Sequence, residues 1–196
     1  VRLFSDEIHG DLVFHGKRHT PTASLSPEIA RYVMTGISGS KTFNLAGLQA
    51  SAMVFPDRHT KHIFDRFWHR MDIHRNNAFS LTAMEAAFNG GEEWLEQLLP
   101  YLSDNFDFVV NFCRTRIPKV KTYAPDATYL MWLDCRDLGL ENDALRDFMI
   151  HKAGLGLNEG WSFGRQLKGF MRLNAACPRS VLSKALTQLE AAVNSL

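Results

Sequence analysis

The sequence predicts an α/β protein, and three observations lead to that prediction. Short apolar runs that are typical of strands alternate with stretches in which apolar residues recur at helical spacing. Two of the predicted strands are followed at once by charged or hydroxyl-bearing residues, at the strand ends where α/β sheets bind their ligands. The 196 residues are 45% hydrophobic and 22% charged, which is the balance of an ordinary globular protein with one or two domains.

The first part of the chain predicts strands separated by loops and a short helix. Residues 1–4 predict a strand that ends at Ser5-Asp6-Glu7, and residues 32–37 predict a second strand. Residues 24–30 predict a short helix between them. A loop rich in Gly and Ser follows the second strand, and the apolar run 48–55 predicts a third.

Helices dominate the middle of the chain. Residues 59–73 and 80–88 carry apolar side chains at helical spacing, and Ser80 is the expected N-cap of the second helix. Residues 92–114 predict a helix long enough to bridge two domains.

After Pro118 the pattern returns to alternating strands and helices. The predicted elements are a strand over residues 128–134, a helix over 142–153, a strand over 169–176 and a terminal helix over 178–193. We place the domain boundary inside the long helix near Leu102. The expected domains are therefore residues 1–101 and 102–196.

Composition excludes several classes of partner and location. The net charge of +1 argues against nucleic acid and anionic membranes as partners. No apolar run approaches a membrane span, and no signal segment opens the chain. Cys113, Cys135 and Cys177 are an odd number at wide spacing, which favours reduced thiols, so we expect a soluble cytoplasmic protein.

The start of the chain is unusual. It opens at Val1 without an initiator methionine and runs directly into a predicted strand, which needs neighbours to pair with. We therefore expect that the protein begins well before Val1 and that this sequence is its C-terminal portion.

Lys41 is the first candidate for chemistry. It lies in Thr35-Gly-Ile-Ser38-Gly-Ser-Lys41-Thr-Phe-Asn44, a mobile loop whose lysine is followed at once by apolar and aromatic residues. Partial desolvation favours the neutral amine, which can attack a carbonyl and form a Schiff base. The alternative is a solvated lysine in a surface loop.

Asp6 and Arg172 carry charges where unpaired charges are costly. Asp6 follows the first strand, and a carboxylate at a buried strand end needs a cation or a hydrogen-bond donor. Its alternatives are a turn or capping residue, and a zinc site with His9 is weak because no second ligand cluster follows. Arg172 interrupts an apolar strand and is suited to a substrate carboxylate, or to an ion pair with a protein carboxylate.

Several segments together resemble one enzyme family. Ser5-Asp-Glu-Ile-His9-Gly-Asp11, Ser38-Gly-Ser-Lys41-Thr-Phe-Asn44 and Phe170-Met-Arg172-Leu-Asn174 look like pyridoxal-phosphate enzymes of the aspartate aminotransferase fold. They look most like the branch that contains the MalY/PatB-type carbon–sulfur β-lyases. Further matches are His19-Thr-Pro21, the strand that ends at Asp134, and Gly160-Trp-Ser-Phe-Gly164 before the arginine strand.

The resemblance implies a fold, a cofactor and a set of roles. The chain would be the end of a large mixed-sheet domain plus a small α+β C-terminal domain, in an enzyme that binds pyridoxal 5'-phosphate. Lys41 would hold the cofactor and move protons, and Asp6 would pair with its ring nitrogen. Ser38 would bind its phosphate, and Arg172 would bind the substrate α-carboxylate. His9 would lie near the phenolic oxygen, although a merely structural role is the alternative.

The sequence departs from the family pattern in two respects. Aminotransferases of this fold often carry an arginine shortly after the lysine that binds the phosphate, and Gln49 and its neighbours offer none. Members of the family are also far longer than this chain, and the residues that stack on the ring and cradle the phosphate cannot be located here.

The reaction implied by the resemblance is elimination of a thiol from cystathionine- or cysteine-type amino acids, which gives pyruvate and ammonia. Lys41 would act as the general base at the substrate α-carbon. Two alternatives stay open: an aminotransferase on the same fold, and a non-catalytic or regulatory protein that has kept the fold. The resemblance also implies a homodimer, and no metal is expected.

Overall fold

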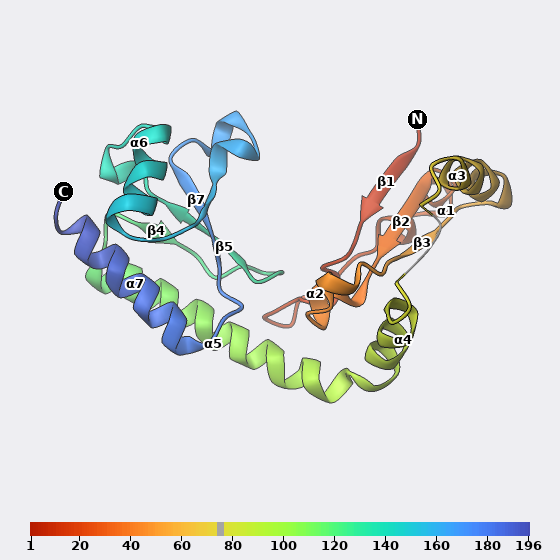
Figure 1. The fold of residues 1–196 in the computed structure, drawn as a ribbon, viewed down its shortest axis with the longest axis horizontal. Coiled ribbons are helices and arrows are strands. Elements are labelled where there is room, and N and C mark those ends of the chain that lie inside the picture. The colour runs from red at the N-terminus through yellow and green to blue at the C-terminus, as the bar shows by residue number, and fades with distance from the viewer. Residues whose placement is uncertain (74–76) are drawn as a thin grey trace. The chain divides into compact units, whose positions relative to one another are not determined.

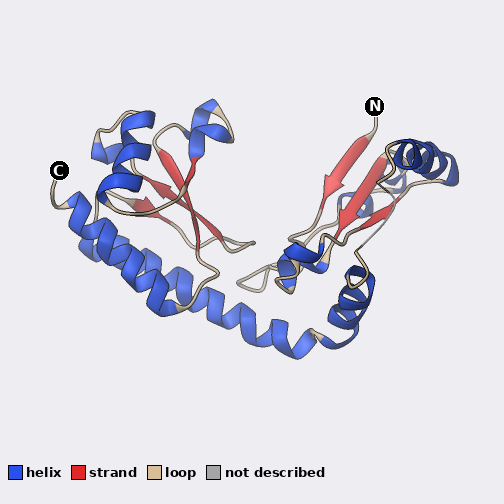
Figure 2. Cartoon of the chain, in the orientation of Figure 1, coloured by secondary structure: helices blue, strands red, loops and turns tan. Residues whose placement is uncertain are grey.

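A computed structural model describes residues 1–73 and 77–196 (Figure 1). The chain divides into two compact units, Val1–Leu99 and Pro100–Leu196. Figure 2 shows helices and strands in both units, as expected for the predicted α/β class. No helix in the described ranges has the length and apolar character that a membrane crossing needs.

The sheet of the first unit has the order β1-β2-β3. Strand β1 (Leu3–Asp6) pairs in parallel with β2 (Val33–Ile37), and β3 (Ala52–Val54) pairs antiparallel with β2. The third strand is shorter than predicted, because residues 46–48 form a 3₁₀ turn and Gln49 adopts a left-handed conformation with φ of 54°.

The described part of this unit contains four α-helices. They are α1 (Pro27–Ala30), α2 (Gly39–Thr42), α3 (Arg58–Arg70) and α4 (Ser80–Gly90). Ser26 and Asp57 cap α1 and α3, since the side-chain oxygens accept hydrogen bonds from the backbone N–H of Ile29 and Thr60.

The predicted N-cap role of Ser80 is wrong. Phe79 occupies the cap position of α4 without a side-chain hydrogen bond. The Ser80 hydroxyl instead donates to the backbone oxygen of Leu48 at 2.5 Å, which ties the start of α4 to the segment before β3.

Helix α5 (Glu92–Arg116) begins in the first unit and continues into the second, with Pro100 in its interior. The second unit contains an antiparallel sheet of order β4-β5-β7-β6. Its strands are β4 (Lys121–Thr122), β5 (Leu130–Asp134), β6 (Asn158–Glu159) and β7 (Phe170–Asn174). Helices α6 (Asn142–Asp147) and α7 (Arg179–Val193) complete the unit.

The predicted helix over residues 142–153 changes its winding partway. The α-helical part ends at Asp147, and Phe148–Lys152 form a π-helical turn. Leu145 and Met149 from these two stretches are fully buried in the core of the unit.

Buried apolar side chains are distributed unequally between the units. In the described part of the first unit they are Leu12, Phe14 and Val33. In the second unit most of them come from α5, β5, β7 and α7 and from the helical stretch 142–152. Helices α5 and α7 lie side by side in this unit (Figure 1), and the Arg116 guanidinium of α5 forms an ion pair of 2.8 Å with Glu190 of α7.

Candidate functional site

The parallel pairing of β1 and β2 brings the two predicted cofactor segments to one edge of a sheet. Asp6 pairs with Gly36 in the register of the two strands, and the backbone N–H of Glu7 donates to Gly36 O at 2.9 Å. Residues 38–41 follow β2 directly. Asp6 and Lys41 therefore leave the sheet at the same, carboxyl edge, as expected from the sequence.

Asp6 is exposed, which corrects the expectation of a buried carboxylate. In this chain β1 pairs on one side only, with β2, and its residues Leu3 and Phe4 are 46% and 52% exposed. One carboxylate oxygen of Asp6 accepts a hydrogen bond of 3.4 Å from the N–H of Ile8. No group of metal-binding side chains occurs among the described residues.

Glu7 fixes the loop that carries Asp6 and His9. Its side chain is 7% exposed and accepts hydrogen bonds from the Ser5 hydroxyl, the Thr22 N–H and His19 Nε2. Burial raises the pKa of Glu7, but the hydrogen bonds from His19, Thr22 and Ser5 outweigh it and hold the pKa below its usual value. The sequence did not single out Glu7, since its partners lie up to 15 residues away.

His9 is half-buried and lies in the turn that follows Glu7. The N–H of Gly10 donates to Glu7 O at 2.9 Å, and the N–H of Leu12 donates to His9 O at 3.0 Å. These two backbone hydrogen bonds fix the position of His9 in the turn that follows Glu7.

Lys41 lies in a short helix rather than in a mobile loop, which corrects the sequence expectation. It occupies the last turn of α2 and is half-buried. Within residues 1–73 and 77–196, its amine makes no hydrogen bond or ion pair. An amine held on a helix without a partner is available to a ligand.

Ser38 is the N-cap of this helix. Its hydroxyl oxygen accepts from the N–H of Ser40 at 3.0 Å, and its proton goes to the backbone oxygen of Ala50 at 2.5 Å. The side chain is therefore engaged in structure. A hydrogen bond from Ser38 to a phosphate requires that its bond to Ala50 be exchanged.

A second contact, which sequence reasoning missed, joins the two segments. Thr42 is fully buried, and its hydroxyl donates to a carboxylate oxygen of Asp11 at 2.9 Å. Since Thr42 follows Lys41 and Asp11 follows His9 by two residues, this bond ties the loop after β1 to the lysine helix.

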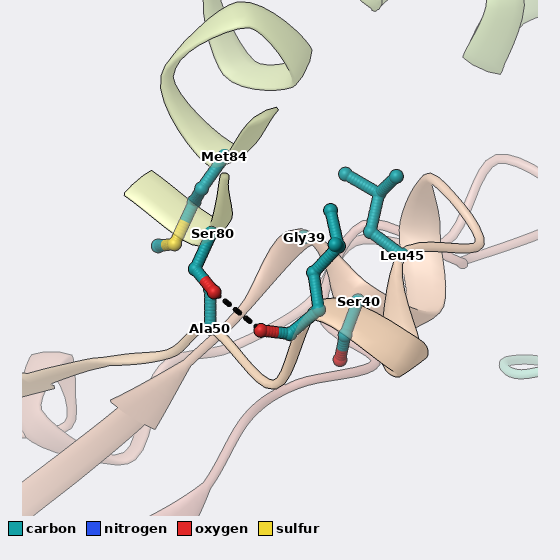
Figure 3. A pocket seen from close by; sticks show the side chains of 7 residues that line it. Gly39, Ser40, Leu45, Ala50, Ser80 and Met84 are labelled. Atoms are coloured by element: carbon teal, nitrogen blue, oxygen red, sulfur yellow. Dashed lines mark hydrogen bonds between the residues drawn. The ribbon is translucent and has the colours of Figure 1, made fainter. Parts of the chain in front are cut away.

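A small pocket lies behind α2 (Figure 3). Its volume is about 10 Å³, and its lining includes Gly39, Ser40, Ser80 and Met84. A cavity of this size holds about one water molecule. The pocket is therefore a packing feature between α2 and α4 and not a cofactor site.

Arg172 lies on β7 in the second unit and is half-buried. Its Nη2 donates to the amide oxygen of Asn158 at 3.0 Å, and its guanidinium lies 4.3 Å from the centre of the Phe163 ring. The buried Nε has no hydrogen-bond partner, and no described carboxylate forms an ion pair with Arg172. The alternative of a structural ion pair is thus not found among the described residues.

Comparison with known proteins gives consistent matches. A sequence model of the aminotransferase class I and II family matches residues 1–189. Cystathionine β-lyase PatB of Bacillus subtilis is 43% identical over 99% of this chain and 50% of its own length. The chain therefore spans about half the length of the curated relatives it matches.

Solved structures match along the whole chain as well. Cystalysin of Treponema denticola, which contains pyridoxal 5'-phosphate, has a TM-score of 0.92 and 32% identity over 100% of this chain and 50% of that one. A pyridoxal-phosphate-bound C–S lyase from Staphylococcus hominis has a TM-score of 0.87 and 33% identity over 98% and 47% of the two chains.

Proposed function

The chain belongs to the aminotransferase class I and II family, and from that premise we propose that the whole protein is a carbon–sulfur β-lyase dependent on pyridoxal 5'-phosphate. It would eliminate a thiol from cystathionine- or cysteine-type amino acids and release pyruvate and ammonia. The similarity to relatives whose names state this activity, led by the 43% identity with PatB, carries the proposal.

The residues of this chain fit the cofactor. A half-buried amine without a partner, that of Lys41, lies at the same sheet edge as the exposed carboxylate of Asp6. Lys41 would hold the cofactor covalently, and Asp6 would pair with its protonated ring nitrogen. When bound, the cofactor supplies an electron sink for the negative charge that develops at the substrate α-carbon.

The remaining roles concern binding and proton movement. The freed Lys41 amine would remove the substrate α-proton as a general base. His9 would lie near the phenolic oxygen, and Ser38 would donate to the phosphate in place of Ala50 O. Arg172 would bind the substrate α-carboxylate through a charge-assisted pair of hydrogen bonds.

The two units receive a domain assignment in this proposal. Residues 1–101 would be the C-terminal portion of the large cofactor-binding domain with the start of the long helix, and residues 102–196 the small C-terminal domain. We further propose a homodimer in the cytoplasm. The odd number of cysteines, all free, supports a reducing location.

The first test separates elimination from transamination. The whole protein with its cofactor and cystathionine should release pyruvate without any added keto acid. Transfer of the amino group that depends on a keto acid, with no pyruvate from cystathionine, would contradict the lyase proposal. That result would favour the aminotransferase candidate, to which the description of the matching family points.

The second test concerns Lys41. Lys41→Ala should abolish the absorbance of covalently bound cofactor and lower pyruvate release by several orders of magnitude, because both the anchor and the base are lost. Lys17→Ala, a change of an exposed lysine of the same unit, is the control. A whole protein that never takes up the cofactor would instead support a non-catalytic role.

A further inference from the structure

We propose that Asn158 and Phe163 are positioning residues that hold Arg172 ready for a carboxylate without neutralising it. The inference deepens the proposed function, because it rests on Arg172 as the anchor of the substrate carboxylate. The carboxylate would meet the terminal nitrogens Nη1 and Nη2, since Nε is covered and the second hydrogen of Nη2 remains after the bond to Asn158.

The sheet fixes the neighbours of Arg172 on both sides. β7 lies between β5 and β6, and Arg172 pairs in register with Trp132 on one side and Asn158 on the other. Directly opposed residues of antiparallel strands project to the same face. Asn158 is therefore placed beside the guanidinium by strand pairing, not by a loop.

A glycine turn brings Phe163 over the guanidinium. A Cβ at Gly160 would come within 2.4 Å of Leu167 O and 2.7 Å of Phe170 O, so only glycine fits at the start of the turn. Gly164 has a φ of 154°, which favours glycine as well. Between them, Phe163 packs edge-on against Trp132, with ring centres 5.6 Å apart and an interplanar angle of 81°.

Both holding contacts leave the positive charge intact. The amide oxygen of Asn158 is a neutral acceptor, and the ring of Phe163 attracts the guanidinium through its negative face. A carboxylate at either position would form a bidentate ion pair and compete with the substrate. The structure thus provides an oriented cation whose charge no described side chain satisfies.

The decisive variant is Asn158→Asp, which keeps the shape of the side chain and adds a competing charge. Asn158 is exposed, so both this variant and Asn158→Ala should fold. Asn111→Asp is the matched control, because Asn111 on α5 also accepts a hydrogen bond from an arginine, Arg114, at 2.8 Å.

The probe is propionate, titrated calorimetrically into the whole protein, with Arg172→Ala defining the heat that depends on the anchor. We expect Asn158→Asp to weaken propionate binding about tenfold or more, and Asn158→Ala and Phe163→Leu by about threefold each. Asn111→Asp should bind propionate as the unaltered protein does. In turnover of cystathionine, Asn158→Asp should raise KM by a similar factor with little change in kcat.

The outcomes separate this inference from the proposed function. Equal binding by Asn158→Asp and Asn158→Ala would overturn the inference, because the added charge would then not face the anchor. Absence of any propionate heat that depends on Arg172 would overturn it too. If propionate binds as expected while no pyruvate forms from cystathionine, the positioning role stands and the lyase proposal falls.

Discussion

At the scale of single residues, the site depends on carboxylates that have different tasks. Asp6 is exposed with most of its hydrogen-bonding capacity open, whereas the neighbouring Glu7 is buried and accepts three hydrogen bonds. The first is suited to a ligand and the second to holding the loop. Adjacent residues of the same charge thus differ in role, because Asp6 ends the strand with its side chain exposed and Glu7 follows it with its side chain buried.

Glu7 makes the stability of the folded protein depend on pH in the acid range. Its folded-state pKa lies below the usual value of 4.5, so the carboxylate stabilises the folded state above about that pH. This stabilisation is lost as the pH falls through the folded-state pKa. We expect Glu7→Gln to lower the free energy of unfolding at pH 7 by about 1–2 kcal/mol, and to weaken the fall in stability below pH 4.5.

The measurement is urea unfolding of the whole protein between neutral pH and pH 3. Glu28→Gln, a change of an exposed carboxylate on α1, is the control and should leave both quantities unchanged. If the free energy of unfolding fell equally steeply with acid pH in Glu7→Gln and in the unaltered protein, this role of Glu7 would be contradicted.

From the sequence we could identify residues that are unusual among their immediate neighbours. A lysine in a Gly/Ser segment and an arginine in an apolar strand are visible as local anomalies, and the roles proposed for Lys41 and Arg172 stay predictions. Glu7, Asp11 and Asn158 were missed because each has a hydrogen-bond partner 14 to 31 residues away, namely Thr22, Thr42 and Arg172. Strand pairing creates the contact of Asn158 with Arg172, and loop packing creates the other two, so none of them leaves a periodic signal in the sequence.

At the scale of elements, Asn105 on α5 joins three parts of the second unit. It is fully buried, and its amide donates to Ala175 O at 2.9 Å and Cys177 O at 3.1 Å, after the end of β7. Its oxygen accepts from Arg179 Nε at 2.8 Å, at the start of α7. One side chain therefore fixes the path from the strand that carries Arg172 to the terminal helix.

Asn105→Leu should destabilise the second unit by about 2–4 kcal/mol, because it leaves two backbone oxygens and the arginine without their partner. The expected result is a lower midpoint in thermal unfolding followed by circular dichroism. Asn111→Leu, an exposed change on the same helix, is the control. Equal midpoints for the two variants would show that the network around Asn105 contributes nothing measurable.

The types of the elements were predictable from hydrophobic periodicity. The errors concern caps and element ends, which depend on contacts that periodicity does not show. Ser80 has a residue type and a position that are typical of an N-cap, but its hydroxyl donates a hydrogen bond to the backbone oxygen of Leu48. The third strand was overestimated because its apolar run begins at the last residue of a 3₁₀ turn and includes the left-handed residue Gln49. The π-helical turn at Phe148–Lys152 has an apolar pattern that resembles an α-helix closely enough to hide it.

At the scale of the whole molecule, the units differ in how much core each contains. The buried apolar side chains of the described chain lie overwhelmingly in Pro100–Leu196, while the first unit contributes Leu12, Phe14 and Val33. Burial of apolar surface is the main favourable contribution to folding. The second unit therefore contains a core of its own, whereas residues 1–99, taken by themselves, bury few apolar side chains.

This difference predicts how the units behave in isolation. Residues 100–196 expressed alone should unfold cooperatively in urea and protect the amides of β5 and β7 from hydrogen exchange. Residues 1–99 alone should show a broad transition and little protection, because few side chains are buried together. A cooperative transition in residues 1–99, or a non-cooperative one in residues 100–196, would contradict the prediction.

The core of the second unit also sets how that unit tolerates random substitution. In the second unit, harmful replacements should act mainly by lowering the folded fraction, so growth at a lower temperature should recover many of them. Replacements of Asp6 and Lys41 in the first unit should act differently, because they remove a chemical group proposed for the site. Cooling restores folding but not a missing chemical group, so those losses should persist at every temperature.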